Sequence, residues 1–208
     1  SIYEIFSRLN TGGLNLSPQE IRGCLYTSPF YDMLYTLNSN KKWRILVGKK
    51  EEDDKFRDVE VLLRSFALYY YETSYTGSMV QFLNRFSKKA QKFDEEEVEK
   101  CKRVFEDFLT VCEAIDPKEF LTKTGSFNVS LFDSVFVVIA NRIRLSGVDS
   151  SKISSEAFDS LKNDENFRNA ITHSTSHVDS VKNRLSLARK YLYGIVDDEL
   201  SDEGEDGK

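Results

Sequence analysis

Hydrophobic residues recur every three or four positions along most of the chain, the spacing that places them on one face of an α-helix. The stripe from Val98 to Cys112 is the longest, and a similar one precedes Tyr193. We therefore predict an all-α fold, an irregular multi-helix bundle. The predicted helices cover residues 2–9, 17–26, 28–37, 58–70, 78–86, 94–112, 130–145, 154–161, 165–170 and 176–193.

Local start signals agree with this pattern. Ser17 and Glu20 have the spacing of a capping box, and Pro18 lies between them at the first helical position. The β-branched run at 135–139 would also suit a strand, but the apolar pattern around it exceeds about 12 residues, which favours a helix. For the last helix we expect a serine cap in the segment 174–176.

Composition limits the class of protein. Only 10 Gly and 3 Pro occur in 208 residues, which favours long helices over many short strands. The chain has three cysteines and no Cys-x-x-Cys pair, so we predict buried free thiols and a reducing, cytoplasmic location. The apolar runs fall short of the roughly 20 residues of a membrane span, so we expect no membrane contact.

Charge and apolar pattern suggest three regions: a helix–loop–helix at 1–37, a helical domain at 38–196 and an acidic tail at 197–208, which we predict to be disordered. The tail holds seven of the acids behind the net charge of −5. Because the helical pattern starts at Ile2, we expect the chain to be part of a longer protein. Apolar residues of the first 37 would then be exposed or covered by a partner.

The loop Asn10-Thr-Gly-Gly13 is the strongest candidate for chemistry. Glycine permits a close approach of the backbone, and amides before a helix N-terminus suit an anion such as phosphate. Arg8 and Arg22 flank the loop in sequence. The alternative is a plain connection between two helices, in which glycine serves only the backbone geometry.

Other candidates carry weaker signals. Arg64 lies at the edge of an apolar stripe, where a half-buried arginine needs an acidic partner, a carbonyl or a ligand. A structural partner within the fold is the commoner explanation. His173 and His177 have a metal-ligand spacing, but no third ligand or catalytic Glu accompanies them. The run Tyr69–Tyr71 suggests packing, and the lysines at 88, 89 and 92 suggest a solvated face. No nucleophile triad or Walker pattern is present.

Residues 5–22 resemble the motif F-x-R-x-N-x-G-G-x-x-L-x-x-x-E-I-R of the GmrSD-type restriction-endonuclease N-terminal domain family, long called domain of unknown function 262. The segments 58–66, 75–84, 127–133 and the final helix with Arg184 are similar to later family segments in the same order. The resemblance covers nearly the whole chain except the acidic tail. The residues that the motif or its neighbourhood marks as candidates for contact with nucleotide or phosphate are Arg8, Asn10, Thr11, Gly12, Gly13, Glu20, Arg22 and, more weakly, Arg64.

The resemblance implies a parent with a ParB/sulfiredoxin-like α+β half, followed by a helical half that this chain matches. It also implies nucleotide-dependent DNA restriction and phage defence, with a nucleoside triphosphate and a divalent metal acting in the parent. The family's D-G-Q-Q-R and His-Asn-His motifs are absent here. We therefore expect no cofactor and no activity in this chain alone, with the missing half and, through the parent, DNA as partners. The alternative is a non-enzymatic scaffold or an interaction module for protein or DNA.

Overall fold

A computed structural model describes residues 3, 5 and 16–196, and within them the chain forms ten α-helices joined by short loops and 3₁₀ turns. These residues contain no strand, only a single antiparallel bridge between Leu121 and Phe127. The prediction of an all-α, irregular multi-helix bundle is confirmed. The helices are α2 (Pro18–Leu25), α3 (Pro29–Asn38), α4 (Lys41–Val47), α5 (Arg57–Tyr71), α6 (Met79–Ala90), α7 (Glu95–Val111), α8 (Val129–Ser146), α9 (Ser155–Asn163), α10 (Glu165–Thr172) and α11 (Val178–Tyr193).

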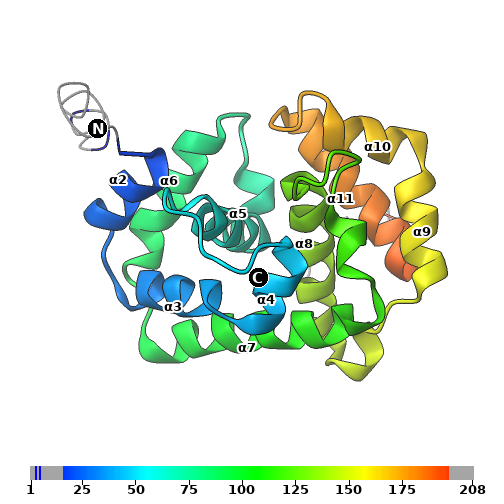
Figure 1. Cartoon of the computed structure of the whole chain (residues 1–208), viewed down its shortest axis with the longest axis horizontal. Coiled ribbons are helices and arrows are strands. Elements are labelled where there is room, and N and C mark those ends of the chain that lie inside the picture. Colours follow the sequence, from blue (N-terminus) through cyan, green and yellow to red (C-terminus); the bar gives the residue numbers. More distant parts are fainter. Residues whose placement is uncertain (1–2, 4, 6–15, 197–208) are drawn as a thin grey trace, which may run out of the picture.

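Helix α8 is the centre of the fold. It packs against α5, α7 and α11, with α2 to α7 on one side and α9 to α11 on the other (Figure 1). Residues 131–140 of α8 are buried without interruption, including the β-branched run at 135–139. A helix surrounded by neighbours needs apolar residues on every face. This explains why its sequence pattern resembles a buried strand.

An aromatic cluster joins the first helices to this centre. The Trp43 ring of α4 lies against Phe105 of α7 and Phe132 of α8, with ring centroids 5.8 and 5.0 Å apart. Phe30 of α3 contacts Phe66 of α5, which in turn contacts α8. Segments far apart in sequence therefore share one core, and that core fixes the position of α4 against α5 and α8.

The helix ends agree with the sequence signals at some positions and not at others. The capping box of Ser17 and Glu20 forms as predicted, with both reciprocal bonds present. The predicted serine cap of α11 is wrong, because His177 holds the N-cap position and makes no capping bond with its side chain. Helix α4 has no counterpart in the prediction. It begins after Asn40, whose side chain caps it, and ends at Gly48 in the left-handed region (φ 74°).

The cysteine prediction holds for two of the three residues. Cys101 and Cys112 are buried free thiols, but Cys24 is exposed. The buried face of α2 is formed by Gln19, Ile21 and Arg22, and Cys24 lies outside it. None of the described helices combines the length and apolar character that crossing a membrane requires.

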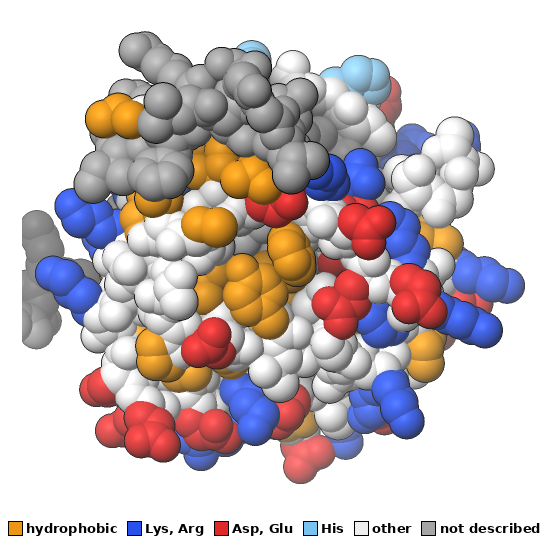
Figure 2. Space-filling view, turned by 60° about the vertical axis from the view of Figure 1, so that its left-hand side comes forward, with side chains coloured by type: hydrophobic (Ala, Val, Ile, Leu, Met, Phe, Trp, Pro, Cys, Tyr) orange, Lys and Arg blue, Asp and Glu red, His pale blue; other side chains and the backbone are white. Residues whose placement is uncertain are grey.

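Apolar exposure among the first 37 residues is mixed. Ile5 and Leu16 are 58% and 40% exposed, whereas Tyr3 and Ile21 are buried. Figure 2 shows the side of the molecule that carries α2, α3 and α6, where hydrophobic side chains are visible near the middle and charged side chains surround them. The remaining apolar residues before Leu16 and the acidic tail at 197–208 lie outside the described residues.

Candidate functional site

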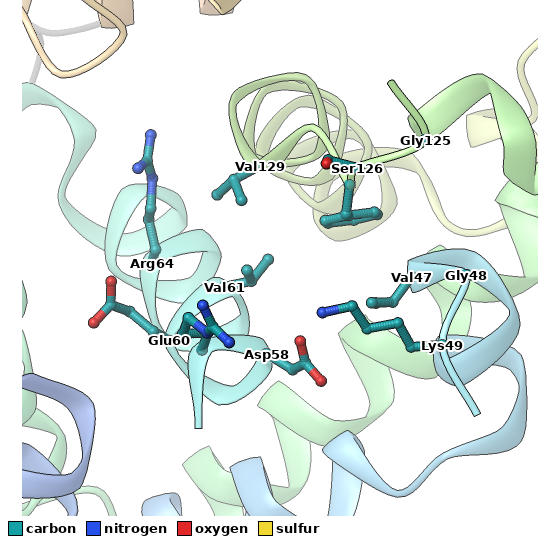
Figure 3. A pocket seen from close by; sticks show the side chains of 12 residues that line it. Val47, Gly48, Lys49, Asp58, Glu60, Val61, Arg64, Gly125, Ser126 and Val129 are labelled. Carbon is teal, nitrogen blue, oxygen red and sulfur yellow. The ribbon is translucent and has the colours of Figure 1, made fainter. Parts of the chain in front are cut away.

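A hollow of about 520 Å³ opens between the end of α4, the first two turns of α5 and the loop that leads into α8 (Figure 3). Its walls are built by three segments that are distant in sequence, at 47–49, 57–64 and 125–129. The ring of Trp43 in α4 packs on Phe127 and Phe132, which holds α4 against the loop that leads into α8. The hollow is therefore a product of the tertiary fold rather than of any one motif.

Three cationic side chains line the hollow. Lys49 extends from the end of α4 toward the first turn of α5, and Arg64 stands about two turns further along α5 (Figure 3). Arg57 is 77% exposed and pairs with Asp53 at 2.8 Å. Lys49 forms no ion pair with any residue in the described part of the chain. Its ammonium group is therefore available to a ligand.

Two helix N-termini face the same space. Helix α5 begins at Arg57 after Phe56, which has a left-handed backbone (φ 53°) and gives no side-chain cap. Helix α8 begins at Val129, which lines the hollow together with Ser126, and the Asn128 side chain caps this helix by accepting the N–H of Leu131 at 3.0 Å. The N-terminus of a helix carries a partial positive charge and free amide donors. Both features favour an anion in the hollow.

The two acids on the wall are already paired with buried arginines. Asp58 accepts a bond from Arg44 Nη2 at 2.8 Å and from the backbone N–H of Asp53 at 3.2 Å. Glu60 is paired with Arg22 of α2. Because each carboxylate has its own cation, neither neutralises Lys49, whereas Arg57 is paired with Asp53. The hollow therefore keeps an excess of positive charge.

Arg44 also fixes the position of Lys49. Its Nε donates to the carbonyl oxygen of Lys49 at 3.1 Å, and its Nη1 donates to Asn38 Oδ1 at 3.0 Å. The same amide oxygen accepts the indole N–H of Trp43 at 3.0 Å. The backbone that presents Lys49 is thus tied to the core by a buried polar network. Such support holds a binding group in place before a ligand arrives.

Arg64 belongs to a buried cluster on the opposite wall. It pairs with Asp133 of α8, which also accepts from Ser65 Oγ at 3.2 Å and lies 3.5 Å from Nη2 of Arg184. Asp133 and Arg184 are fully buried, and this burial lowers the pKa of Arg184 to about 10. The structural pairing expected for Arg64 is confirmed.

This cluster contains two guanidinium groups and one carboxylate. Among the described residues, Nη2 of Arg64 and Nε of Arg184 have no hydrogen-bond partner. An unpaired buried donor costs free energy, and an added anion would remove that cost for any donor it reaches. Arg64 lines the hollow, but its unpaired Nη2 is buried and its paired Nε faces Asp133, so the residue contributes charge to this wall and no open donor.

Two more of the residues marked by the sequence have structural roles, Glu20 at the start of α2 and Arg22 between α2 and α5. Glu20 accepts the backbone N–H of Ser17 at 2.6 Å, and this bond holds the pKa of Glu20 below its ordinary value. Arg22 is buried and donates from Nε to Gln19 at 2.9 Å as well as pairing with Glu60. Arg8, Asn10, Thr11, Gly12 and Gly13 lie outside the described residues.

A second hollow, of about 480 Å³, lies at the start of α2 beside the first. It is lined by Ser17, Gln19 and Lys55, and it shares Arg57 and Glu60 with the larger hollow. Ser17, at the start of α2, therefore lies beside the same charged surface. The structure brings Arg64 to this surface directly and Arg22 to it through its partner Glu60.

The histidine pair shows no metal site. Nδ1 of His173 lies 2.9 Å from the hydroxyl of Thr172, and within the described residues no group of three or more His, Cys, Asp or Glu side chains could hold an ion. The tyrosine run packs as predicted, with Tyr70 stacked on Phe86.

Of the residues that line the hollow, the sequence analysis marked Arg64 as a candidate and did not mark Lys49 or Ser126. Lys49 falls in a charged segment that was expected to be a loop, and Ser126 falls in the loop before α8. The only local signal for Lys49 was Gly48, a residue typical of a helix C-terminus. That signal places Lys49 next to a helix end but does not identify the wall that it faces.

No protein-family model, curated protein or solved structure matches this chain.

Proposed function

We propose that this chain is the helical, phosphate-contacting portion of a nucleotide-dependent DNA restriction or defence protein. The observation that carries the proposal is the hollow between α4, α5 and α8, in which Lys49, Arg57 and Arg64 meet two helix N-termini. The choice of a nucleotide and of DNA as ligands of the parent rests on the resemblance of residues 5–22 to the restriction-endonuclease family.

The size and chemistry of the hollow support a nucleotide phosphate as the ligand. Small-molecule sites typically have volumes of about 300–1,000 Å³, and this hollow lies within that range. Arginine and lysine form charge-assisted bonds with phosphate oxygens, and the exposed side chains of Lys49 and Arg57 line the hollow. Val47, Val61 and Phe127 add apolar wall beside the charged groups.

The loop Asn10–Gly13 belongs to the same proposed site. Gly13 precedes Ser17 by four residues, a length of chain that spans at most about 14 Å. Ser17 lines the second hollow, which shares Arg57 with the first. Backbone amides around Gly12 and Gly13 are therefore within chain reach of a phosphate held by Arg57. In this proposal Arg8 and Asn10 add side-chain contacts.

In this proposal the chain binds the nucleotide but does not hydrolyse it by itself. Phosphoryl transfer requires a positioned nucleophile, a metal or general base, and stabilisation of the transferred charge. The described residues offer the last of these through Lys49, Arg57 and Arg64. The first two are assigned to the α+β half of the parent. In that parent, Arg8→Ala or Asn10→Ala should reduce nucleotide-dependent activity roughly tenfold or more.

Calorimetric titration of the full 208-residue chain tests the proposal. Magnesium ATP, magnesium GTP and inorganic triphosphate are the ligands, and the variant Lys49→Ala/Arg57→Ala removes two contacts. A charge-assisted bond contributes roughly 1.5–3 kcal/mol, so each lost contact should weaken binding about tenfold or more. Lys182→Ala, an exposed position on α11, is the control and should leave affinity unchanged.

The alternative is a scaffold that binds no nucleotide. One observation favours it, namely that Arg22, Arg44 and Arg64 all have structural partners within the fold. The same titration separates the two functions. A scaffold gives no saturable heat with any of the three ligands, and Lys49→Ala/Arg57→Ala then behaves as the unmodified chain does.

A further inference from the structure

A small apolar hollow of about 200 Å³ opens between α4, the end of α7 and the 3₁₀ turns that follow α7. Its walls are formed by Leu46 of α4, Leu109 of α7, and Ile115 and Pro117 from the segment after α7. This hollow shares no lining residue with the phosphate hollow. An inference drawn from it therefore stands apart from the proposed function.

The size and the lining of this apolar hollow suit one aliphatic side chain. A dry apolar cavity of about 150 Å³ holds a benzene-sized group, whereas sites for small molecules and cofactors typically measure about 300–1,000 Å³. With about 200 Å³, the hollow is closer to the first class. The expected occupant is therefore a projecting apolar residue of a protein.

Ile45 of α4 stands at the rim of the same hollow and projects into solvent. It is 63% exposed, although the neighbouring Trp43, Leu46 and Val47 of this short helix are buried. Burying an isoleucine side chain is favourable, and the fold leaves this one in water. One face of the molecule thus carries an apolar projection and an apolar hollow side by side.

Two opposite charges stand at the rim as well. Lys42 Nζ and Glu113 Oε1 form an ion pair at 2.5 Å, and the two side chains are 56% and 57% exposed. Because the face carries a projection, a hollow, a cation and an anion, it is complementary to a second copy of itself. In a two-fold dimer each residue meets its complement on the other chain twice, once in each direction.

We propose that this face joins two copies of the chain in a two-fold symmetric dimer. Ile45 of each copy enters the apolar hollow of the other, and Lys42 of each copy pairs with Glu113 of the partner subunit. An unrelated partner would need only one member of each complementary pair on this face, and the face has both. The contact is small for an interface, so we expect a concentration-dependent dimer with a dissociation constant on the order of 10 μM.

Sedimentation velocity of the full 208-residue chain from about 1 to 200 μM tests the dimer. The unmodified chain should pass from monomer to dimer over this range. Ile45→Ala removes both apolar projections, each contributing about tenfold or more, and should weaken the dimer about hundredfold or more. Leu145→Ala removes an apolar side chain of α8 that is 68% exposed, and it should leave association unchanged.

Charge reversal tests how the two copies are oriented. Lys42→Glu gives a chain with two acids at the rim, and Glu113→Lys gives a chain with two cations, so each variant alone should remain monomeric. An equal mixture of the two should recover the dimer, because opposite charges then meet at both contacts. Lys42 lies in the first turn of α4 and Glu113 follows the end of α7, where the reversed charges suit the helix dipoles. Both variants should therefore fold, which far-ultraviolet circular dichroism checks.

Several results would overturn the proposal. One is a chain that stays monomeric at about 200 μM, and another is a dimer that Ile45→Ala leaves intact. An equal loss of association in Leu145→Ala would assign the dimer to a different face. A mixture of Lys42→Glu and Glu113→Lys that remains monomeric would contradict the proposed two-fold pairing.

Discussion

Removing the charge of Asp133 should destabilise the protein by about 3–5 kcal/mol, the typical result of taking one partner from a buried ion pair. Asp133 is the only described carboxylate that pairs with Arg64 and Arg184, and it is fully buried. The change Asp133→Asn preserves shape and leaves both cations without an anion. Arg184 is fully buried, so water does not replace the lost partner.

A second substitution tests the cause of the expected loss of stability in Asp133→Asn. If an uncompensated charge causes the loss, removing that charge should recover part of it. Asp133→Asn/Arg184→Met should therefore be more stable than Asp133→Asn alone, since buried ion pairs are often replaced by apolar side chains at little cost. Asp149→Asn is the matched control. Asp149 is 94% exposed and pairs with Lys152, so its loss should leave the urea midpoint nearly unchanged.

Urea unfolding followed by tryptophan fluorescence measures these changes. The single tryptophan, Trp43, is fully buried and reports on the core between α4, α7 and α8. With an m value of about 2–3 kcal/mol/M, the midpoint for Asp133→Asn should fall by about 1–2 M. The reasoning would be refuted if the urea midpoint of Asp133→Asn fell no further than that of Asp149→Asn. It would also be refuted if Asp133→Asn/Arg184→Met were less stable than Asp133→Asn.

Two further predictions concern thiols and pH. With a thiol reagent, Cys24 should react rapidly in the folded protein, whereas Cys101 and Cys112 should react only after unfolding. Both of these thiols are buried, and burial raises the pKa of Cys101 to about 12. Rapid reaction of two thiols in the folded protein would contradict this prediction. Asp164→Ala should cost about 0.5–2 kcal/mol at pH 7 through loss of the α10 cap. The Phe167 amide lowers the pKa of Asp164 below 3.8, so this stabilisation is present above about pH 4 and is lost as pH falls through the lowered pKa. Urea unfolding at pH 7 and pH 2.5 should show a cost that shrinks in acid, and a constant cost would contradict it.

The sequence predicted those elements whose signals are local. The capping box of Ser17 and Glu20 and the long apolar span of α8 each lie within one helix, so pattern alone located them. Helix α4 was missed because its seven residues include too few turns to show a period. Its signals were Asn40 at the start and Gly48 at the end, which also suit a turn and a loop.

The site depends on contacts that no local pattern contains. Asp133 meets Arg184 across 51 positions and Arg64 across 69, and the pairing follows from the packing of α5 and α11 on α8. The backbone of Lys49 is held beside the hollow by Arg44, which is itself bound to Asn38. Cys24 is exposed because the buried face of α2 passes through Ile21 and Arg22. Each of these facts depends on the relative placement of helices.

Mapping a triphosphate onto the folded chain tests the central claim most directly. Backbone amide signals of the isotope-labelled full chain are followed while magnesium ATP or inorganic triphosphate is added. The account predicts saturable shifts concentrated at Lys49, Arg57, Ser126 and Val129, which line the hollow, and their loss in Lys49→Ala/Arg57→Ala. Saturable shifts centred elsewhere, or none at millimolar ligand, would contradict the assignment of this hollow as a phosphate site.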